Sequence, residues 1–262
     1  MVINTGRTES IEKYFEVVQE LLDRGFVVLV HDWRRQGLSQ RLLADRLKGH
    51  VDDFDDFVAD FRTLLDELAA QLPKPWIVLG HSMGGGLTML ALTEGEKRFS
   101  ACVLTSPMLG LKDTPFYARP VAWLSGHVGC TEKQRSDPDD DPYWTNFDKN
   151  VFTHDPQRYR RYSDMLAANP ELALGAPTYG WIDSALTGIA RIQAHAATSI
   201  PVVILSAGDD SIVDNASHEA VAARLPNARV VKVPGAFHEI LIERDDIRAQ
   251  FWREFDAVAA AI

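Results

Sequence analysis

Short apolar runs alternate along most of the chain with stretches in which apolar residues recur at helical spacing. The runs are rich in β-branched residues, which is typical of strands buried on both faces of a sheet. Strands that alternate with helices in this way predict an α/β fold, a mostly parallel sheet flanked by helices. The predicted strands are Met1–Asn4, Phe26–His31, Trp76–Leu79, Ala101–Thr105, Val202–Ser206 and Arg229–Val233.

The clearest helical periodicity lies near the start and the end of the chain. Apolar residues between Ile11 and Leu22 recur on one helical face, and Gly25 follows where such a helix would end. A longer amphipathic helix is predicted from Phe54 to Leu68, with acidic residues ahead of it that suit the positive end of the helix dipole. The final residues, from about Arg244 to Ile262, are predicted to form the last helix.

The strand rhythm disappears between residues 110 and 197, a stretch rich in Trp, Tyr, Pro and Asp. A structureless loop of that length inside a compact domain is improbable. We therefore expect residues 110–197, called the cap segment below, to form a helical insertion over one end of the sheet. Residues 1–109 and 198–262 would then form a single core domain.

Composition narrows the classes of function. The net charge of −10 argues against nucleic-acid binding and against attachment to anionic lipid, because both need clustered Lys and Arg. No apolar run approaches the roughly 18 residues that predict a membrane span, and the first residues do not resemble a signal peptide. Cys102 and Cys130 form no disulfide framework. We expect a cytoplasmic protein with no cofactor and no metal, in at most transient contact with lipid. The acidic stretch Asp137–Asp141 could suggest calcium, but Pro138, Pro142 and the lack of spaced ligands favour a solvated loop.

The strongest chemical signal is the sequence Gly80-His81-Ser82-Met83-Gly84. It comes directly after a predicted strand and directly before a helical pattern, which is the context of the nucleophile elbow. That turn lifts a serine hydroxyl above the sheet and needs residues without a Cβ where the backbones approach. Ser82 is therefore the predicted nucleophile. The backbone N–H of Met83 would stabilise an oxyanion at the helix N-terminus, and His81 would pack nearby or support the site.

A serine hydroxyl at neutral pH needs a base, and the base needs an orienting carboxylate. In the chain order typical of the elbow, the acid and then the histidine follow the serine. Of the histidines well beyond Ser82, His238 alone lies in a predicted loop just after a strand. His154 and His195 fall in the cap segment, and His218 falls in a predicted helix. We predict that His238 is the base.

Two adjacent carboxylates could orient that base. Asp209 and Asp210 both follow the predicted strand Val202–Ser206. We prefer Asp210 because the apolar pair Ile212–Val213 after it would anchor the following turn, and Asp209 is the alternative. An acid one strand earlier is excluded, because Ser106–Met108 contains no carboxylate.

Several segments resemble the bacterial lysophospholipase and monoacylglycerol lipase group of α/β-hydrolases, which are similar to serine aminopeptidases of family S33. The resemblance extends from Ile3 to about Glu243 and implies the α/β-hydrolase fold and an ester substrate. The elbow is common to the whole fold, whereas Gly175–Trp181 resembles the cap of this particular group. The segments are NTGRTESIEKY, HDWRRQGLSQR, GHSMGGG, SPMLG, GAPTYGW, DDSIVDN and GAFHEI.

The same resemblance implies a second oxyanion donor. In this group it follows a His-Gly pair after an early strand, and the matching stretch here is Asn4–Arg7, so the donor would be the backbone N–H of Arg7. Thr5 stands where histidine is common in this group, but the donor is a backbone N–H and does not depend on that side chain. The group also begins with two further strands for which this chain has no room. Either the sheet is shortened at its N-terminus or the true start lies upstream of Met1. With the shortened N-terminus we expect a sheet edge that is exposed or covered anew, which would allow a homodimer.

The expected substrate is an ester with one fatty-acyl chain and a small polar head, cleaved through a Ser-His-Asp triad and an acyl-enzyme. Tyr179 and Trp181 are the predicted substrate-binding residues, although the cap aromatics could equally form a small core of their own. The negative charge favours monoacylglycerol over lysophospholipid, and Arg119 or Arg158 in the cap segment would reverse that preference. The alternatives are a small-ester carboxylesterase or amidase, and a catalytically inactive ligand-binding protein of the same fold.

Overall fold

A six-stranded, fully parallel sheet forms the centre of the protein, with strand order β2-β1-β3-β4-β5-β6. The computed structural model describes residues 1–112, 120–121, 123–124, 129–135 and 141–262. The parallel sheet predicted from the alternating pattern is confirmed. The strands are β1 Val2–Asn4, β2 Leu29–His31, β3 Ile77–His81, β4 Ala101–Thr105, β5 Val202–Ala207 and β6 Ala228–Val233.

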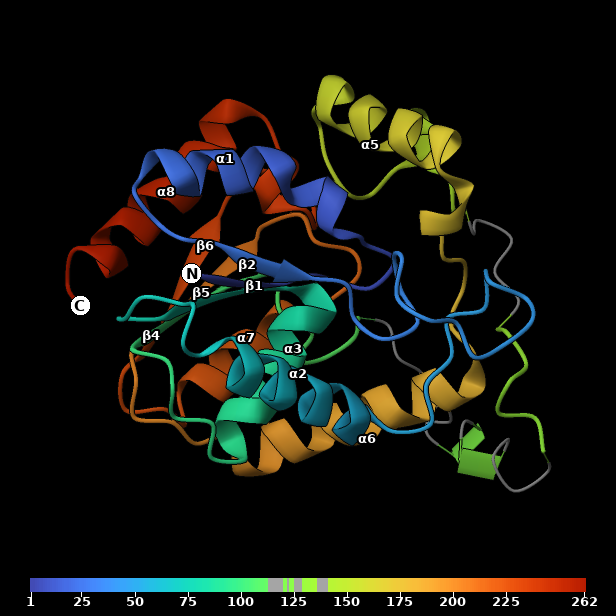
Figure 1. Cartoon of the computed structure of the whole chain (residues 1–262), viewed down its shortest axis with the longest axis horizontal. Coiled ribbons are helices and arrows are strands. Elements are labelled where there is room, and N and C mark those ends of the chain that lie inside the picture. The colour runs from blue at the N-terminus through green and yellow to red at the C-terminus, as the bar shows by residue number, and fades with distance from the viewer. Residues whose placement is uncertain (113–119, 122, 125–128, 136–140) are drawn as a thin grey trace.

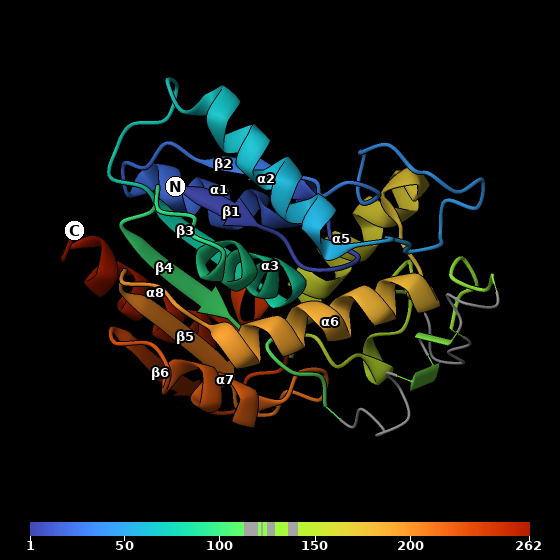
Figure 2. The ribbon, with the colours of Figure 1, turned by 90° about the horizontal axis from the view of Figure 1, so that it is seen from below.

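Helices cover both faces of this sheet (Figures 1 and 2). On one face lie α1 (Phe15–Asp23) and α8 (Asp245–Ala259). The opposite face carries α2 (Phe54–Leu68), α3 (Ser82–Thr93) and α7 (Asn215–Ala222), and α6 (Tyr179–His195) packs against α3. Helix α5 (Pro156–Ala168) lies beyond the edge of this sandwich. Short 3-10 helices span Ile11–Tyr14, Phe147–Lys149, Pro170–Leu172 and Ile240–Ile242.

The central strands β3, β4 and β5 are buried along their whole length because each face of the sheet has its own apolar layer. Successive strand residues point to opposite faces. In β3, Val78 therefore joins the layer of α2 and α3, whereas Ile77 and Leu79 join the layer of α1 and α8. Both layers hold the sheet rigidly, which fixes the positions of the loops at its ends.

Strand β2 is shorter than predicted. The apolar run begins at Phe26, but the strand begins at Leu29, and Val27 is 47% exposed. The reason is the length of its neighbour, because β1 contains only three residues and pairs with Leu29–His31 alone. Strand β1 lies inside the sheet, between β2 and β3, so β2 is the edge strand on this side.

The cap segment divides its contacts between two cores. Residues of α6, among them Ala185 and Ile192, belong to the main apolar core below the sheet. Residues of α5 and its surroundings form a separate cluster of Trp144, Tyr159, Tyr162, Leu166, Leu172, Ala173 and Ile242. Arg119 and all of Asp137–Asp141 except its last residue lie outside the described residues. None of the described helices combines the length and the apolar character that crossing a membrane requires.

Candidate active site

The predicted catalytic residues meet at one edge of the sheet. In a parallel sheet the carboxyl ends of all strands lie on the same side, and loops at that side carry most ligand sites. Arg7 follows β1, Ser82 follows β3, Asp210 follows β5 and His238 follows β6. Four loops that are far apart in sequence therefore lie along the same edge, because β1, β3, β5 and β6 run in the same direction in one sheet.

Ser82 adopts a strained backbone conformation at the junction of β3 and α3. Its φ angle is +50°, in the left-handed region that non-glycine residues rarely occupy. The turn can form only because its neighbours are glycines. A Cβ on Gly84 would overlap the carbonyl oxygens of Asn4 and Thr5, and a Cβ on Gly80 would lie 2.8 Å from the Cα of Gly85. The elbow is thus packed directly against the loop that follows β1.

Ser82, His238 and Asp210 form a continuous chain of polar contacts. His238 Nε2 lies 2.9 Å from Ser82 Oγ, and His238 Nδ1 lies 2.7 Å from Asp210 Oδ2. The second carboxylate oxygen of Asp210 accepts backbone N–H groups from Ile212 at 2.8 Å and Val213 at 3.1 Å. These are the distances at which a base can take a proton from a hydroxyl and at which a carboxylate can hold the tautomer of that base.

The two candidate acids have different environments. Asp210 is 3% exposed and contacts His238, whereas the side chain of Asp209 is exposed. Burial alone would raise the pKa of Asp210, but hydrogen bonding and attraction to His238, together with the backbone N–H donors, hold it below its ordinary value. Asp210 therefore remains a carboxylate, as an orienting acceptor must be.

The loop after β1 is held by side chains from residues 33–36. Trp33 Nε1 donates to the carbonyl of Thr5 at 2.8 Å, and Gln36 Nε2 donates to the carbonyl of Gly6 at 3.0 Å. The Arg7 guanidinium donates to the carbonyl of Gly175 at 2.5 Å and lies 5.1 Å from the centre of the Trp181 ring. Arg7 is thereby placed between the elbow and the cap segment.

The remaining histidines lie in other settings. His154 Nδ1 is 2.7 Å from Glu243 Oε1, and His195 is an exposed residue at the end of α6. His218 is fully buried, with Nε2 2.8 Å from the carbonyl oxygen of Pro107. Burial lowers the pKa of His218 and keeps it neutral. None of these three contacts the hydroxyl of Ser82 within the part of the chain that the structure describes.

A cavity of about 1040 Å³ opens beside Ser82 and His238. Arg7, Met83 and Trp181 also line it, whereas Tyr179 is not among its described lining residues. Helical geometry explains the difference, since residues two positions apart on a helix point to different sides. The apolar part of the wall consists of Met108, Leu111, Trp144, Val151, Phe152, Leu174, Pro177, Trp181, Ile182, Leu186, Ile212 and Val213.

Basic side chains line the cavity despite the acidic composition. Among the described lining residues these are Arg7, Lys112, Arg135 and Lys149. Arg158, in contrast, is not among the described lining residues and pairs with Glu16 on α1. The overall charge of the chain thus gives a poor account of the local charge around Ser82.

Part of the cap segment is joined to the loop of His238 through the backbone. The carbonyl of Val151 accepts the N–H of His238 at 3.4 Å, and the carbonyl of Phe152 accepts the N–H of Glu239 at 2.9 Å. Thr153 Oγ1 donates to the carbonyl of Ile242 at 2.7 Å. Residues 151–153 therefore form one wall of the cavity and support the histidine loop at the same time.

Sequence reasoning did not identify several polar residues that build the site. Gln36 holds the loop after β1, and Glu9, Lys13 and Glu239 form buried ion pairs close to the triad. One signal was available, since Glu239 directly follows His238 in a segment that is otherwise apolar. No comparable signal marks Gln36, because its role depends on a contact across 30 positions of sequence.

The fold and this geometry agree with known proteins. The sequence matches the family described as serine aminopeptidase, S33, over residues 1–245. Together with the relatives below, this match identifies the chain as an ester hydrolase with the α/β-hydrolase fold. The chain belongs to that S33 family, and the resemblance stated from its motifs is confirmed.

Named relatives cover nearly the whole chain. Lysophospholipase L2 of Escherichia coli (strain K12) is 35% identical over an alignment of 271 positions, which covers 95% of this chain and 76% of that protein. Monoacylglycerol lipase of Mycolicibacterium smegmatis is 29% identical, over 93% of this chain and 82% of that protein. The crystal structure of Paleococcus ferrophilus monoacylglycerol lipase has a TM-score of 0.77 at 19% identity, covering 99% of this chain and 93% of that chain, and supports the fold.

Proposed function

We propose that this protein hydrolyses lipid esters with a single acyl chain through a Ser82–His238–Asp210 triad and an acyl-enzyme. The observation that carries the proposal is the hydrogen-bonded chain of these three residues at the wall of a cavity of about 1040 Å³. The cavity is large enough for a ligand of lipid size. The family and the lipid-esterase names of the relatives support the same reaction class.

The proposed reaction is a series of proton transfers between Ser82, His238 and the substrate. Ser82 Oγ attacks the ester carbonyl carbon while its proton passes to His238 Nε2, and Asp210 stabilises the resulting imidazolium. The tetrahedral intermediate collapses, the alcohol leaves with the proton from His238, and the acyl group stays on Ser82. Water then attacks the acyl-enzyme and gives a proton to His238. The second tetrahedral intermediate collapses, the C–O bond to Ser82 breaks, and His238 returns the proton to Ser82 Oγ as the fatty acid leaves.

The negative oxygen of the intermediate needs preorganised donors. Met83 is the second residue of α3, so its N–H belongs to the first helical turn, which has no acceptor within the helix. The backbone N–H of Arg7 is the second proposed donor, because the contact of Gly84 with the loop after β1 brings that loop against the elbow. Both residues line the cavity.

The cap segment, residues 110–197, is the proposed lid over the acyl-binding part of the cavity. Ile182 and Leu186 from α6, together with Trp181, give one apolar wall, and Val151 and Phe152 give another. Each methylene of an acyl chain buried there contributes about 0.8 kcal/mol. A long-chain ester therefore gains far more from this cavity than a short one, which favours a lipid over a small ester or amide.

The head group is proposed to carry a phosphate. Among the described lining residues, four are basic (Arg7, Lys112, Arg135 and Lys149) and three are acidic (Glu9, Asp141 and Glu239). The excess of positive charge suits an anionic head, and the name of the 35%-identical relative, lysophospholipase L2, points the same way. Lysophospholipid is thus preferred over the monoacylglycerol that the net charge alone favoured.

A phosphonate probe and an ester panel test this proposal. Intact-mass analysis is expected to show one label, on Ser82, and Ser82→Ala should abolish labelling and hydrolysis. A label on another serine, or full activity of the variant, would contradict the proposed triad. Among substrates, kcat/KM should be highest for lysophosphatidylcholine, then for monoacylglycerol of the same chain length, then for acetate esters.

Two basic rim residues test the head group separately. Arg135→Met with Lys149→Met should lower kcat/KM for lysophosphatidylcholine about 10-fold, the loss of roughly one charge-assisted contact, and leave monoacylglycerol hydrolysis unchanged. Lys97→Met, an exposed residue ahead of β4, is the matched control for loss of positive charge. Equal losses for both substrates would rule out phosphate recognition by these two side chains.

A further inference from the structure

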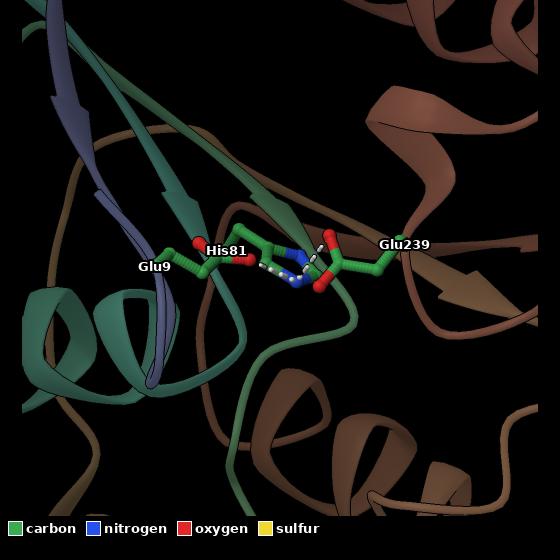
Figure 3. Close-up of side chains that lie close together, drawn as sticks. All are labelled: Glu9, His81 and Glu239. Atoms are coloured by element: carbon green, nitrogen blue, oxygen red, sulfur yellow. Dashed lines mark ion pairs between the residues drawn. The ribbon is translucent and has the colours of Figure 1, made fainter. Parts of the chain in front are cut away.

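A cluster of buried charges lies next to the candidate triad. We call Glu9, Lys13, His81 and Glu239 the buried quartet; their side chains are at most 6% exposed. Lys13 Nζ lies 2.5 Å from Glu9 Oε1 and 2.7 Å from Glu239 Oε1. His81 Nε2 lies 3.1 Å from Glu239 Oε2 and 3.6 Å from Glu9 Oε1. Figure 3 shows the imidazole between the two carboxylates.

Three members of the buried quartet adjoin three different parts of the site. His81 precedes Ser82, Glu239 follows His238, and Glu9 lies two residues after Arg7. The rings of His81 and His238 are 5.0 Å apart between their centres. The buried quartet thus connects the elbow, the histidine loop and the proposed oxyanion loop, which are remote in sequence.

The charges of the buried quartet stabilise one another. His81 Nδ1 lies 3.1 Å from the carbonyl oxygen of Thr105, which can only accept, so Nδ1 carries a hydrogen and Nε2 faces the carboxylates. Burial would lower the pKa of His81, but Glu239 and Glu9 raise it above its ordinary value. Burial would raise the pKa of Glu239, but His81 and Lys13 hold it well below. Burial and repulsion from Glu239 raise the pKa of Glu9, so Lys13 and His81 stabilise Glu239 as a carboxylate more strongly than they stabilise Glu9.

Two carboxylates and an imidazole are also residue types that bind divalent metals. Here the ammonium group of Lys13 lies within 2.7 Å of both carboxylates, where a cation ligated by them would have to lie. The ammonium is therefore the cation of this cluster, and ion pairing rather than metal binding explains its composition.

Glu9 links the buried quartet to the backbone of the proposed oxyanion loop. It accepts the N–H of Gly6 and, at 2.6 Å, the hydroxyl of Tyr14. The Gly6 amide precedes the peptide unit that carries the N–H of Arg7. The direction of that donor consequently depends on the place of the Glu9 carboxylate, which depends in turn on Lys13.

Building on the proposed hydrolase function, we propose that the buried quartet is a positioning device that holds the histidine loop and the oxyanion loop in register with the elbow. Glu239 and Lys13 are its positioning residues, and neither takes part in bond making. A displacement of about 1 Å at a catalytic group can lower a rate by about 100-fold. Breaking the Lys13–Glu239 pair should therefore reduce kcat more than it changes KM.

Single and double variants separate positioning from stability. Glu239→Gln and Lys13→Met should each lower kcat about 100-fold, with KM changed less than threefold, and should lower Tm because the charges of the buried quartet no longer balance. The double variant removes opposite charges together, so Tm should recover. Its kcat should stay low, because the tie between the loops is still missing.

Recovery of kcat together with Tm in the double variant would overturn the proposal, because the buried quartet would then serve stability alone. Unchanged kcat in either single variant would overturn it as well, and a poorly folded single variant leaves the decision to the double variant. Glu96→Gln is the matched control, since buried Glu96 pairs with Arg98 at 2.6 Å at the opposite end of the sheet; it should lower Tm and leave kcat within twofold. A wild-type protein without esterase activity or phosphonate labelling would instead contradict the proposed function.

Discussion

The two sides of the cavity are held in place by different forces. On the sheet side, Ser82 follows β3, whose residues are all buried between two apolar layers, and His238 follows β6, which ends at the buried residue Val233. On the cap side, α5 is attached through ion pairs of Glu16 with Arg158 and Arg161, each at 2.7 Å, and through an aromatic cluster. Apolar packing around β3 is insensitive to salt, whereas the ion pairs that attach α5 are partly solvated and respond to salt and pH.

This difference in support predicts that the rate of the chemical step and the preference for substrate depend on different residues. Loops fixed by the sheet can hold reacting atoms to within a fraction of an ångström, which governs the rate of the chemical step. Half-buried cap side chains that line the cavity, such as Leu186, are expected to affect substrate preference more than they affect the sheet. Changes on the sheet side should therefore alter kcat, and changes on the cap side should alter substrate preference or the attachment of α5.

The largest effect is expected from the acid on the sheet side. Asp210→Asn should lower kcat by about 10⁴-fold, because an amide favours the wrong tautomer of His238. Asp209→Asn, one position away and exposed, is the matched control and should change kcat less than threefold. Steady-state kinetics on one chromogenic ester checks both. If the two variants exchanged ranks, the orienting acid would be Asp209.

A smaller effect is expected on the cap side of the cavity. Leu186→Trp should fill part of the apolar wall of α6 and lower kcat/KM for a 16-carbon ester by about 10-fold, as expected for losing roughly two buried methylenes. Hydrolysis of an acetate ester should be unchanged. Thr187→Trp, exposed on the same helix, is the control. A chain-length series below the micelle threshold gives the measurement, and equal losses at both lengths would exclude Leu186 from the acyl wall.

The smallest effect concerns the polar attachment of α5. Burial would raise the pKa of Glu16, but hydrogen bonds and charges from Arg158, Arg248 and Arg161 lower it from 4.5 to about 2. The stability that ionised Glu16 contributes is therefore complete above pH 4.5 and is lost as the pH falls towards 2.

Glu16→Gln should consequently be less stable than wild type at pH 7, with a difference that shrinks between pH 4.5 and 2. Thermal unfolding followed across this range measures it, and kcat at pH 7 should stay within twofold. Asp256→Asn, which breaks the more exposed pair of Arg24 with Asp256, should have a smaller effect. A constant difference between wild type and Glu16→Gln at all pH values would show that the charge of Glu16 does not attach α5.

The sequence predicts best those features that depend on residues close together in the chain. The strand, the glycines and the helix around Ser82 are contiguous, so a short window contains all that the elbow requires. Helix α2 was predicted from Phe54 to Leu68 and spans those residues, because its apolar spacing is regular throughout. The structure also brings Asp210 and His238 to Ser82, as their places after neighbouring strands suggested.

Features that depend on distant partners could not be predicted in this way. The start of β2 depends on the length of β1, and the pairing of Lys13 with Glu239 joins opposite ends of the chain. Trp181 and Tyr179 are both aromatic residues of the same short motif, and only the packing of α6 decides which of them faces the cavity. Net charge likewise failed to indicate the basic residues around Ser82, since it averages over the whole surface.

The backbone bonds between residues 151–153 and the histidine loop limit how lids can be exchanged among related enzymes. A chimaera that replaced the whole cap segment would also remove the carbonyl groups of Val151 and Phe152, which hold the N–H groups of His238 and Glu239. The cap taken from the related enzyme would have to supply carbonyl acceptors in the same two positions. A chimaera should therefore keep residues 151–155 of this protein and take up the donor sequence again at Pro156, the first residue of α5. The carbonyl groups that hold the N–H groups of His238 and Glu239 would then stay in place.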